Sequence, residues 1–358
     1  MAQYITFQPK DYFNTLLYTG TGSTNAVTGV GFQPDMVWSK NRDQTYNHQI
    51  NDAVRGVNKQ LAPNNTNAQE TNTGELTAFG SDGFTVGSGG TLNGNGDGIV
   101  SWNWRAGTGA GSSNTDGSIN TTYTSVNTTA GISISSYTGT GSNATIGHGL
   151  GVVPQVIIVK NTYQAEHWIV YHHKIDDAAS GGGGAPQDKY IRLNDTGTRA
   201  DFPMWNDTAP TSSVFSVGTS TSVNQAGGTH VAYCFAEKKG FSKFGSVQGN
   251  GNDDGPFIYT GFKPAFLLYK VYNGGTGQWL MFDNTRNETN VVNKFLKTDD
   301  NSVEGTSATA NKVDFLSNGI KIKENNGDLN LGTGYNYLYM AFAEHPLVSS
   351  NDIPGTAR

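Results

Sequence analysis

Cysteine, charge and long apolar runs are all scarce in this chain of 358 residues. The single cysteine, Cys234, excludes an intrachain disulfide and argues against a thiolate metal site. Charged residues make up 15% of the chain, below the usual share of about a quarter, and the net charge of −6 gives no electrostatic basis for binding nucleic acid. No apolar run reaches the roughly 18 residues of a membrane-spanning helix, so we expect no membrane insertion. Residues 1–13 also lack the pattern of a secretory signal.

The residues that are present form a repeat. A glycine-rich opening occurs three times, each followed by a proline and an apolar run that ends in lysine, and each third of the chain closes on an aromatic-rich segment. The openings lie at 18–25, 137–143 and 247–251, the proline runs at 34–40, 154–160 and 264–270, and the closing segments at 100–104, 231–235 and 338–342. Repeats of this length match independent domains and exceed solenoid or propeller modules.

Short β-branched and aromatic runs, separated by Gly, Asn, Asp, Ser and Thr, predict an all-β protein. We expect three tandem β-sandwich domains, jelly-roll or lectin-like, related by the internal repeat. The first covers residues 1–106, a linker covers 107–118, and the second and third cover 119–241 and 242–358 with a C-terminal tail. The second and third should pack directly, and the first, which differs most, is the hypothetical docking domain.

Two further local features follow from the sequence pattern. The glycine-rich segment 176–188 is expected to be an exposed, mobile loop. Only Val291 to Leu296 has the i, i+4 apolar spacing of a helix, which predicts one short helix there.

The repeat resembles a domain family found in tail-fibre and related virion structural proteins of marine tailed bacteriophages. The resemblance covers roughly residues 12–346 and rests on motifs in all three repeats. These are Tyr18 to Asn25, Gly31 to Pro34, Ser81 to Phe84 and Trp102 to Trp104, then Ala130 to Ile134, Gly147 to Gly151 and Ala232 to Glu237, then Gly255 to Phe262, Asp314 to Gly319 and Met340 to Glu344. It implies a protein on the exterior of a phage particle and transfers no active site.

Candidate chemistry is sparse. His172 and His173 are adjacent, so a regular strand would direct them to opposite faces, and we expect them to be solvated residues at a strand end. No metal-ligand spacing remains among the histidines. Weak calcium-loop candidates are Asn250, Asn252 and Asp254, and a similar run occurs at 93–98, but neither has the glutamate expected at the twelfth position. We therefore predict no catalytic residues, no metal and no cofactor.

Aromatic side chains carry the binding hypothesis, because sugar rings stack on Trp and Tyr. The candidates for glycan binding are Trp205, Tyr163 and Tyr272, which lie in polar surroundings and are expected to be exposed. Trp168 is a further aromatic candidate, but with Trp279 it opens equivalent apolar runs and is better explained as core.

These patterns favour a non-enzymatic structural protein of a tailed-phage virion, as a tail fibre or spike that binds a host surface glycan or protein. Capsid decoration on the head surface is the alternative, and polysaccharide depolymerase is the third. Expected partners are other virion proteins and copies of the same chain in a homo-oligomer, of which a trimer is one form.

Overall fold

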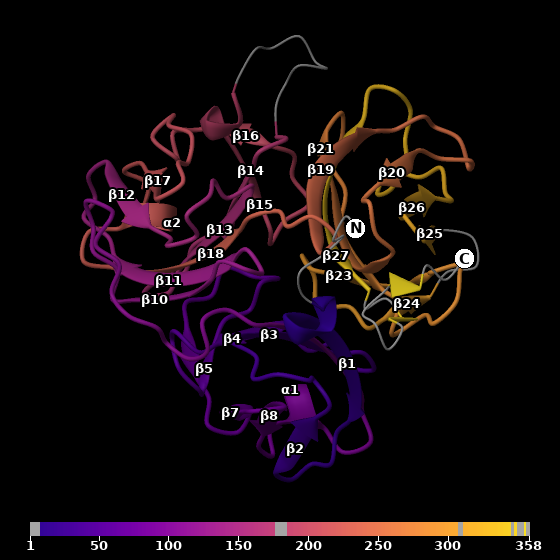
Figure 1. Ribbon diagram of the computed structural model, residues 1–358, viewed down its shortest axis with the longest axis horizontal. Helices are drawn as coiled ribbons and strands as arrows, with labels where there is room; N and C mark the ends of the chain where they lie inside the picture. The colour runs from indigo at the N-terminus through magenta and orange to yellow at the C-terminus, as the bar shows by residue number, and fades with distance from the viewer. Residues whose placement is uncertain (1–7, 176–184, 307–310, 345–346, 349–353, 356–358) are drawn as a thin grey trace.

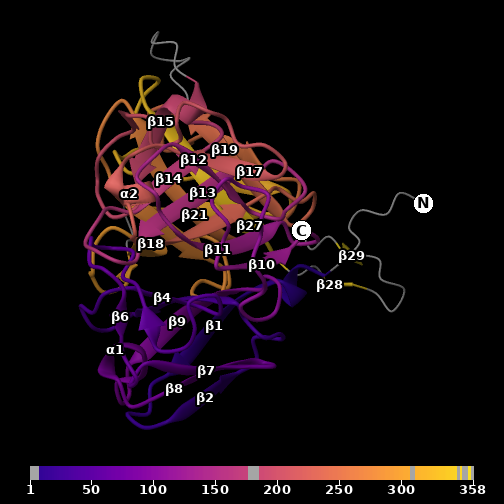
Figure 2. The ribbon, with the colours of Figure 1, turned by 90° about the vertical axis from the view of Figure 1, so that its left-hand side faces the viewer.

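The computed structural model describes residues 8–175, 185–306, 311–344, 347–348 and 354–355, and it is an all-β protein of β-sandwich character. Three lobes surround a common centre, one for each third of the chain (Figure 1). Lobe 1 comprises β1 to β9 (13–104), lobe 2 comprises β10 to β18 (123–235), and lobe 3 comprises β19 to β27 (242–343). Figure 2 shows lobe 1 below the other two. Most of the predicted exposed loop, residues 176–184, lies outside the described residues.

Each lobe contains a larger and a smaller antiparallel sheet. The larger sheets have the orders β1-β9-β3-β4, β10-β11-β18-β13-β14-β15-β16 and β19-β27-β21-β22-β23-β24, and the smaller ones β2-β8-β7, β12-β17 and β20-β26-β25. Two-stranded pairs β5-β6 and β28-β29 complete the set.

The strand bounds in lobe 1 are β1 Phe13–Thr19, β2 Asn25–Thr28, β3 Met36–Asn41, β4 Gln49–Asp52, β5 Lys59–Gln60, β6 Glu70–Thr71, β7 Leu76–Gly80, β8 Gly83–Val86 and β9 Gly98–Trp104. Those in lobe 2 are β10 Tyr123–Asn127, β11 Ile132–Thr138, β12 Ala144–Gly147, β13 Val156–Asn161, β14 Ile169–His172, β15 Lys189–Arg192, β16 Ala200–Asp201, β17 Val214–Val217 and β18 Thr229–Phe235. Those in lobe 3 and beyond are β19 Ser242–Gln248, β20 Phe257–Tyr259, β21 Pro264–Asn273, β22 Trp279–Asp283, β23 Lys294–Lys297, β24 Gly305–Thr306, β25 Val313–Leu316, β26 Gly319–Ile322, β27 Asn336–Ala343, β28 Leu347–Val348 and β29 Pro354–Gly355.

Helical structure is confined to single turns in the described residues. These are η1 Pro9–Asp11, α1 Gly90–Asn93, η2 Pro186–Asp188 and α2 Thr221–Asn224. The predicted helix at 291–296 is wrong, because Val292 pairs with Val313 and β23 begins at Lys294. The i, i+4 spacing there reflects residues of the short strand β23 and the segment before it, rather than one face of a helix. No helix in the described part of the chain is long and apolar enough to cross a membrane.

The central strands of the larger sheets are buried on both faces, which explains their continuous apolar runs. In β13, Ile157 and Val159 point into the core of lobe 2, whereas Val156 and Ile158 point into a core that all three lobes share. The two faces alternate as the two-residue period of a strand requires. Each lobe therefore has an interior of its own between its two sheets and a second face packed against the other lobes.

Aromatic rings from all three lobes meet in this shared core. The ring of Phe342 in lobe 3 lies 5.1 Å from Phe13 and 5.8 Å from Trp104 in lobe 1, and 6.2 Å from Phe235 in lobe 2. Phe235 also lies 6.4 Å from Phe244. The expected direct packing of the second and third repeats is confirmed, and it extends to the first.

Equivalent hydrogen bonds join the lobes in a cycle. The indole of Trp168 donates from Nε1 to the Ala62 carbonyl of lobe 1 at 3.0 Å, and that of Trp279 donates to the Arg192 carbonyl of lobe 2 at 2.8 Å. His48 occupies the same strand position in lobe 1, and its Nε2 lies 2.9 Å from the Lys297 carbonyl of lobe 3. The three carbonyls are themselves at equivalent positions, so each lobe contacts its neighbour in the same way (Figure 1).

Residues 107–118 connect lobes 1 and 2 and are hydrogen-bonded to both. The backbone N–H groups of Thr108 and Gly109 donate to the Asp35 carboxylate at 3.0 and 2.6 Å, and Ser112 forms a bridge with Thr124. The connection therefore holds the two lobes in place as well as joining them.

Candidate functional site

Two of the three aromatic residues predicted to bind glycans are buried. Trp205 is 2% exposed, lies 5.8 Å from the Tyr171 ring and donates from Nε1 to the Lys189 carbonyl at 3.0 Å. Tyr272 is 3% exposed and belongs to the shared core. Their predicted exposure is wrong, because polar neighbours in the sequence do not prevent a turn from folding its ring inward. Tyr163 is 64% exposed, and glycan binding by Tyr163 stays a prediction.

Trp168 and Trp279 have the core positions that their repeat equivalence predicts, at 0% and 3% exposure. The two adjacent histidines are less solvated than expected. His172 is buried with Nε2 3.3 Å from the Tyr339 carbonyl, and Nε2 of His173 lies 3.0 Å from the Phe244 carbonyl. Burial lowers the pKa of His172 to about 3, so this side chain is neutral at physiological pH.

The oxygen atoms of the calcium-loop candidates are engaged in turns. Asn250 Oδ1 accepts from the Asn252 N–H at 3.0 Å, Asn252 Oδ1 accepts from the Asp254 N–H at 2.9 Å, and Asp254 pairs with Lys321 at 2.8 Å. Among the described residues, no group of three or more His, Cys, Asp or Glu side chains is placed to hold a metal ion. The motif is explained by the turn that it builds.

The glycine-rich openings have the same structural role in each lobe. A buried asparagine accepts a backbone N–H of the opening at 2.8 Å in all three lobes, from Thr21 to Asn93, Thr140 to Asn224 and Asn250 to Asn330. These recurring asparagines fix the loops in all three lobes.

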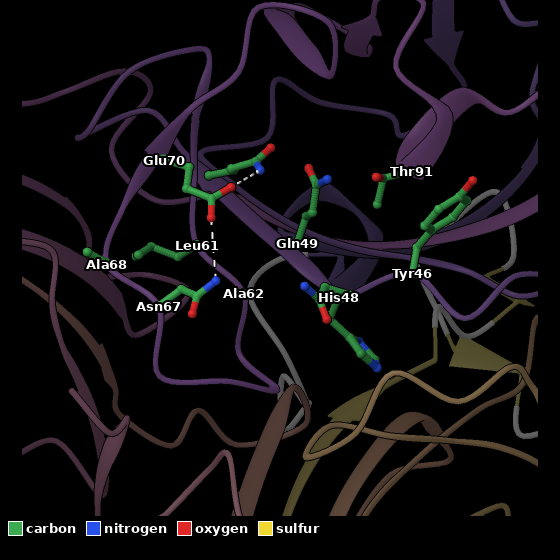
Figure 3. A pocket seen from close by; sticks show the side chains of 11 residues that line it. Tyr46, His48, Gln49, Leu61, Ala62, Asn67, Ala68, Glu70 and Thr91 are labelled. Atoms are coloured by element: carbon green, nitrogen blue, oxygen red, sulfur yellow. Dashed lines mark hydrogen bonds between the residues drawn. The ribbon is translucent and has the colours of Figure 1, made fainter. Parts of the chain in front are cut away.

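A polar pocket in lobe 1 is the strongest candidate site. Its volume is about 210 Å³, and Figure 3 shows Gln49 between Glu70 on one side and Tyr46 and Thr91 on the other. Strand β4 supplies Gln49, and the β5-β6 pair supplies Gln60 and Glu70. The full lining is Tyr46, Asn47, His48, Gln49, Gln60, Leu61, Ala62, Asn67, Ala68, Glu70 and Thr91.

The pocket contains amide oxygens without hydrogen-bond partners. Gln49 is 4% exposed, and its Oε1 has no partner in the described part of the chain. The same holds for Oε1 of Gln60, whose Nε2 donates to Glu70 at 3.0 Å. A buried polar atom left without a partner costs about 1–3 kcal/mol. Within the described residues, both oxygens are therefore free to accept a hydrogen bond from a donor outside the chain.

Charge in the pocket is low. Burial and the nearby Lys40 hold the pKa of His48 well below its usual value, so its ring is neutral, and its Nδ1 accepts from Trp38 Nε1 at 3.1 Å. Glu70 is the acidic residue of the lining, and the other members are neutral amides, Tyr46, Thr91 and small or apolar residues. The arrangement is suited to binding a neutral hydroxyl-bearing ligand and lacks a positioned acid–base pair.

None of Gln49, Gln60 and Glu70 was identified from the sequence. A signal was present: the segment 48–51 is the lobe 1 equivalent of 168–171 and 279–282, and it has a glutamine where the others have Ile169 and Leu280. Only the strand registers make this alignment clear, because the first repeat has diverged most.

The chain is thus an all-β protein of β-sandwich character whose lobes share a core and one of which holds a polar pocket. It belongs to the family described as Domain of unknown function (DUF7483), whose model matches residues 8–346. The match spans all three lobes as one unit. No curated protein and no solved structure matches the chain.

Proposed function

We propose that this chain is a non-enzymatic structural protein on the exterior of a tailed-phage virion, where it acts as a tail fibre or spike that binds a host surface glycan. The lobe 1 pocket carries the proposal, because its unpartnered Gln49 oxygen and its half-exposed Tyr46 ring, 43% exposed, are the groups that neutral saccharides require. The phage context rests on the resemblance of the repeated motifs.

In this proposal the lobes are three β-sandwich repeats, jelly-roll or lectin-like, with bounds 1–106, 119–241 and 242–358. The matching sheet pairs and the cyclic hydrogen bonds support this division. Because a single sugar pocket binds weakly, useful avidity would come from several copies, so we propose a homo-oligomer, a trimer among its forms, attached to other virion proteins.

Adsorption tests this function. Purified full-length protein should bind host cells and block infection, and gold-labelled antibody should mark the tail of intact particles by electron microscopy. Labelling of heads assembled without tails would contradict a fibre or spike. Release of reducing sugar ends from host polysaccharide would contradict the absence of catalysis and favour a depolymerase.

Capsid decoration remains the second proposal, and the approximate threefold arrangement of the lobes favours it (Figure 1). A single chain with three lobes around a common centre fits a threefold position on a shell, where each lobe would contact one capsid subunit. Antibody labelling of heads assembled without tails would support capsid decoration over a fibre or spike.

A further inference from the structure

The lobe 1 pocket occupies a place that hydrophobic side chains fill in the other two lobes. The strand registers align the lobes residue by residue, since each larger sheet pairs its edge strands in the same way. Three polar residues of lobe 1 correspond to apolar or small residues elsewhere: Gln49 to Ile169 and Leu280, Gln60 to Tyr190 and Phe295, and Glu70 to Ala200 and Gly305.

Aromatic rings close this space in lobes 2 and 3. Tyr190 is 7% exposed within the lobe 2 core, and the Phe295 ring lies so close to Gly305 that no Cβ fits there. In lobe 1 the Gln60 side chain turns to the Glu70 carboxylate instead, and about 210 Å³ stays open. This is the volume of roughly seven water molecules and lies below the range of about 300–1,000 Å³ for drug-sized ligands.

The replacements work against stability unless a ligand uses them. Interior positions held by Ile169 and Leu280 contribute apolar burial, whereas Gln49 at the same position buries an amide oxygen that has no partner in the described residues. Such a group calls for a specific explanation, and a bound ligand that donates hydrogen bonds supplies one.

We propose that the lobe 1 pocket binds a single neutral sugar residue through its hydroxyl groups. The hydroxyls would donate to Oε1 of Gln49 and Gln60 and to the Glu70 carboxylate, while the ring of Tyr46 would cover the apolar face of the sugar. The negative charge of Glu70 disfavours acidic sugars, and the volume admits one ring rather than a chain. The inference names the ligand class of the proposed attachment function and so rests on it.

The test is ligand-observed saturation-transfer NMR with the full-length protein. The probes are glucose, galactose, mannose and N-acetylglucosamine, with N-acetylneuraminic acid as the charged comparison. At least one neutral sugar should bind, and Gln49→Leu, which installs the lobe 3 residue, should weaken binding about tenfold or more. Gln60→Phe should abolish binding by filling the pocket, and both variants should keep the wild-type thermal midpoint or exceed it.

Tyr259→Ala is the matched control, because it removes an exposed aromatic ring from lobe 3, and it should bind the sugar as the wild type does. The inference is overturned if no neutral sugar binds, if only the charged sugar binds, if Gln49→Leu binds unchanged, or if the control Tyr259→Ala alone loses binding. Adsorption to cells without monosaccharide binding would overturn sugar binding by the lobe 1 pocket and leave the attachment function standing. If the protein binds a sugar and Gln60→Phe abolishes that binding, but the protein does not adsorb to cells, the sugar pocket stands and the attachment function is overturned.

Discussion

Truncation of Phe342 measures how strongly the three lobes depend on one another. This residue is 1% exposed, and its ring contacts rings of lobes 1 and 2 at 5.1 to 6.2 Å. A buried Phe→Ala change costs about 3–5 kcal/mol through lost burial and the cavity left behind. Aromatic pairs add about 0.5–1.5 kcal/mol beyond area burial, so Phe342→Ala should fall at the upper end, about 4–5 kcal/mol.

Native-state hydrogen exchange followed by mass spectrometry reports this loss in each lobe separately. We expect Phe342→Ala to lower protection by a similar free energy in β9, β18 and β27, because their residues line one shared core. Phe215→Ala is the comparison variant, because Phe215 belongs to the interior of lobe 2 and lies outside the shared core. If Phe342→Ala lowered protection only in β27, the lobes would be independent domains and the reasoning from a shared core would be refuted.

Three further changes probe single contacts. Trp102→Phe removes the 3.1 Å hydrogen bond from Nε1 to Asp283 between lobes 1 and 3, and urea denaturation should show a loss of about 1–2 kcal/mol. Burial lowers the pKa of Lys160 to about 8, so between pH 8 and 10 this side chain is protonated more often in the unfolded chain than in the folded chain. The free energy of unfolding should therefore rise by about 2 kcal/mol from this group as the pH rises through that range. In urea titrations across the range, Lys160→Met should remove that rise. Asn224→Ala leaves the backbone of the loop 139–143 without its buried partner and should cost about 2–3 kcal/mol, with faster proteolysis at that loop.

The repeat and the strand class could be predicted from the sequence because they depend on local patterns. Runs such as 156–159 are apolar at every position, which is typical of strands covered on both faces, and the structure covers both faces of this strand. The pattern does not reveal what covers the second face. Sandwich strands in separate domains and strands packed on a neighbouring lobe have the same sequence signature, so the shared core became visible only in the structure.

The pocket escaped prediction for a different physical reason. Gln49 and Gln60 are polar residues in short edge strands, where a sequence pattern predicts exposure, and both lie in the wall of a cavity. Trp205 shows the opposite error, since its polar neighbours indicated a surface ring that the fold buries. Burial of a single side chain depends on contacts with distant strands, which local composition does not encode.

Covalent linkage of the three lobes permits an asymmetry that a homotrimer cannot have. The contacts of His48, Trp168 and Trp279 with the neighbouring lobe are those expected between subunits of a cyclic trimer. In three identical subunits, an unpartnered glutamine in each interior would weaken every subunit at once. Here only lobe 1 has a buried glutamine, Gln49, at this position, while Ile169 and Leu280 keep the equivalent interiors of lobes 2 and 3 apolar. Because the shared core ties lobe 1 to two well-packed lobes, lobe 1 can hold a polar cavity and stay folded, and the cavity lies in the repeat whose sequence has diverged most.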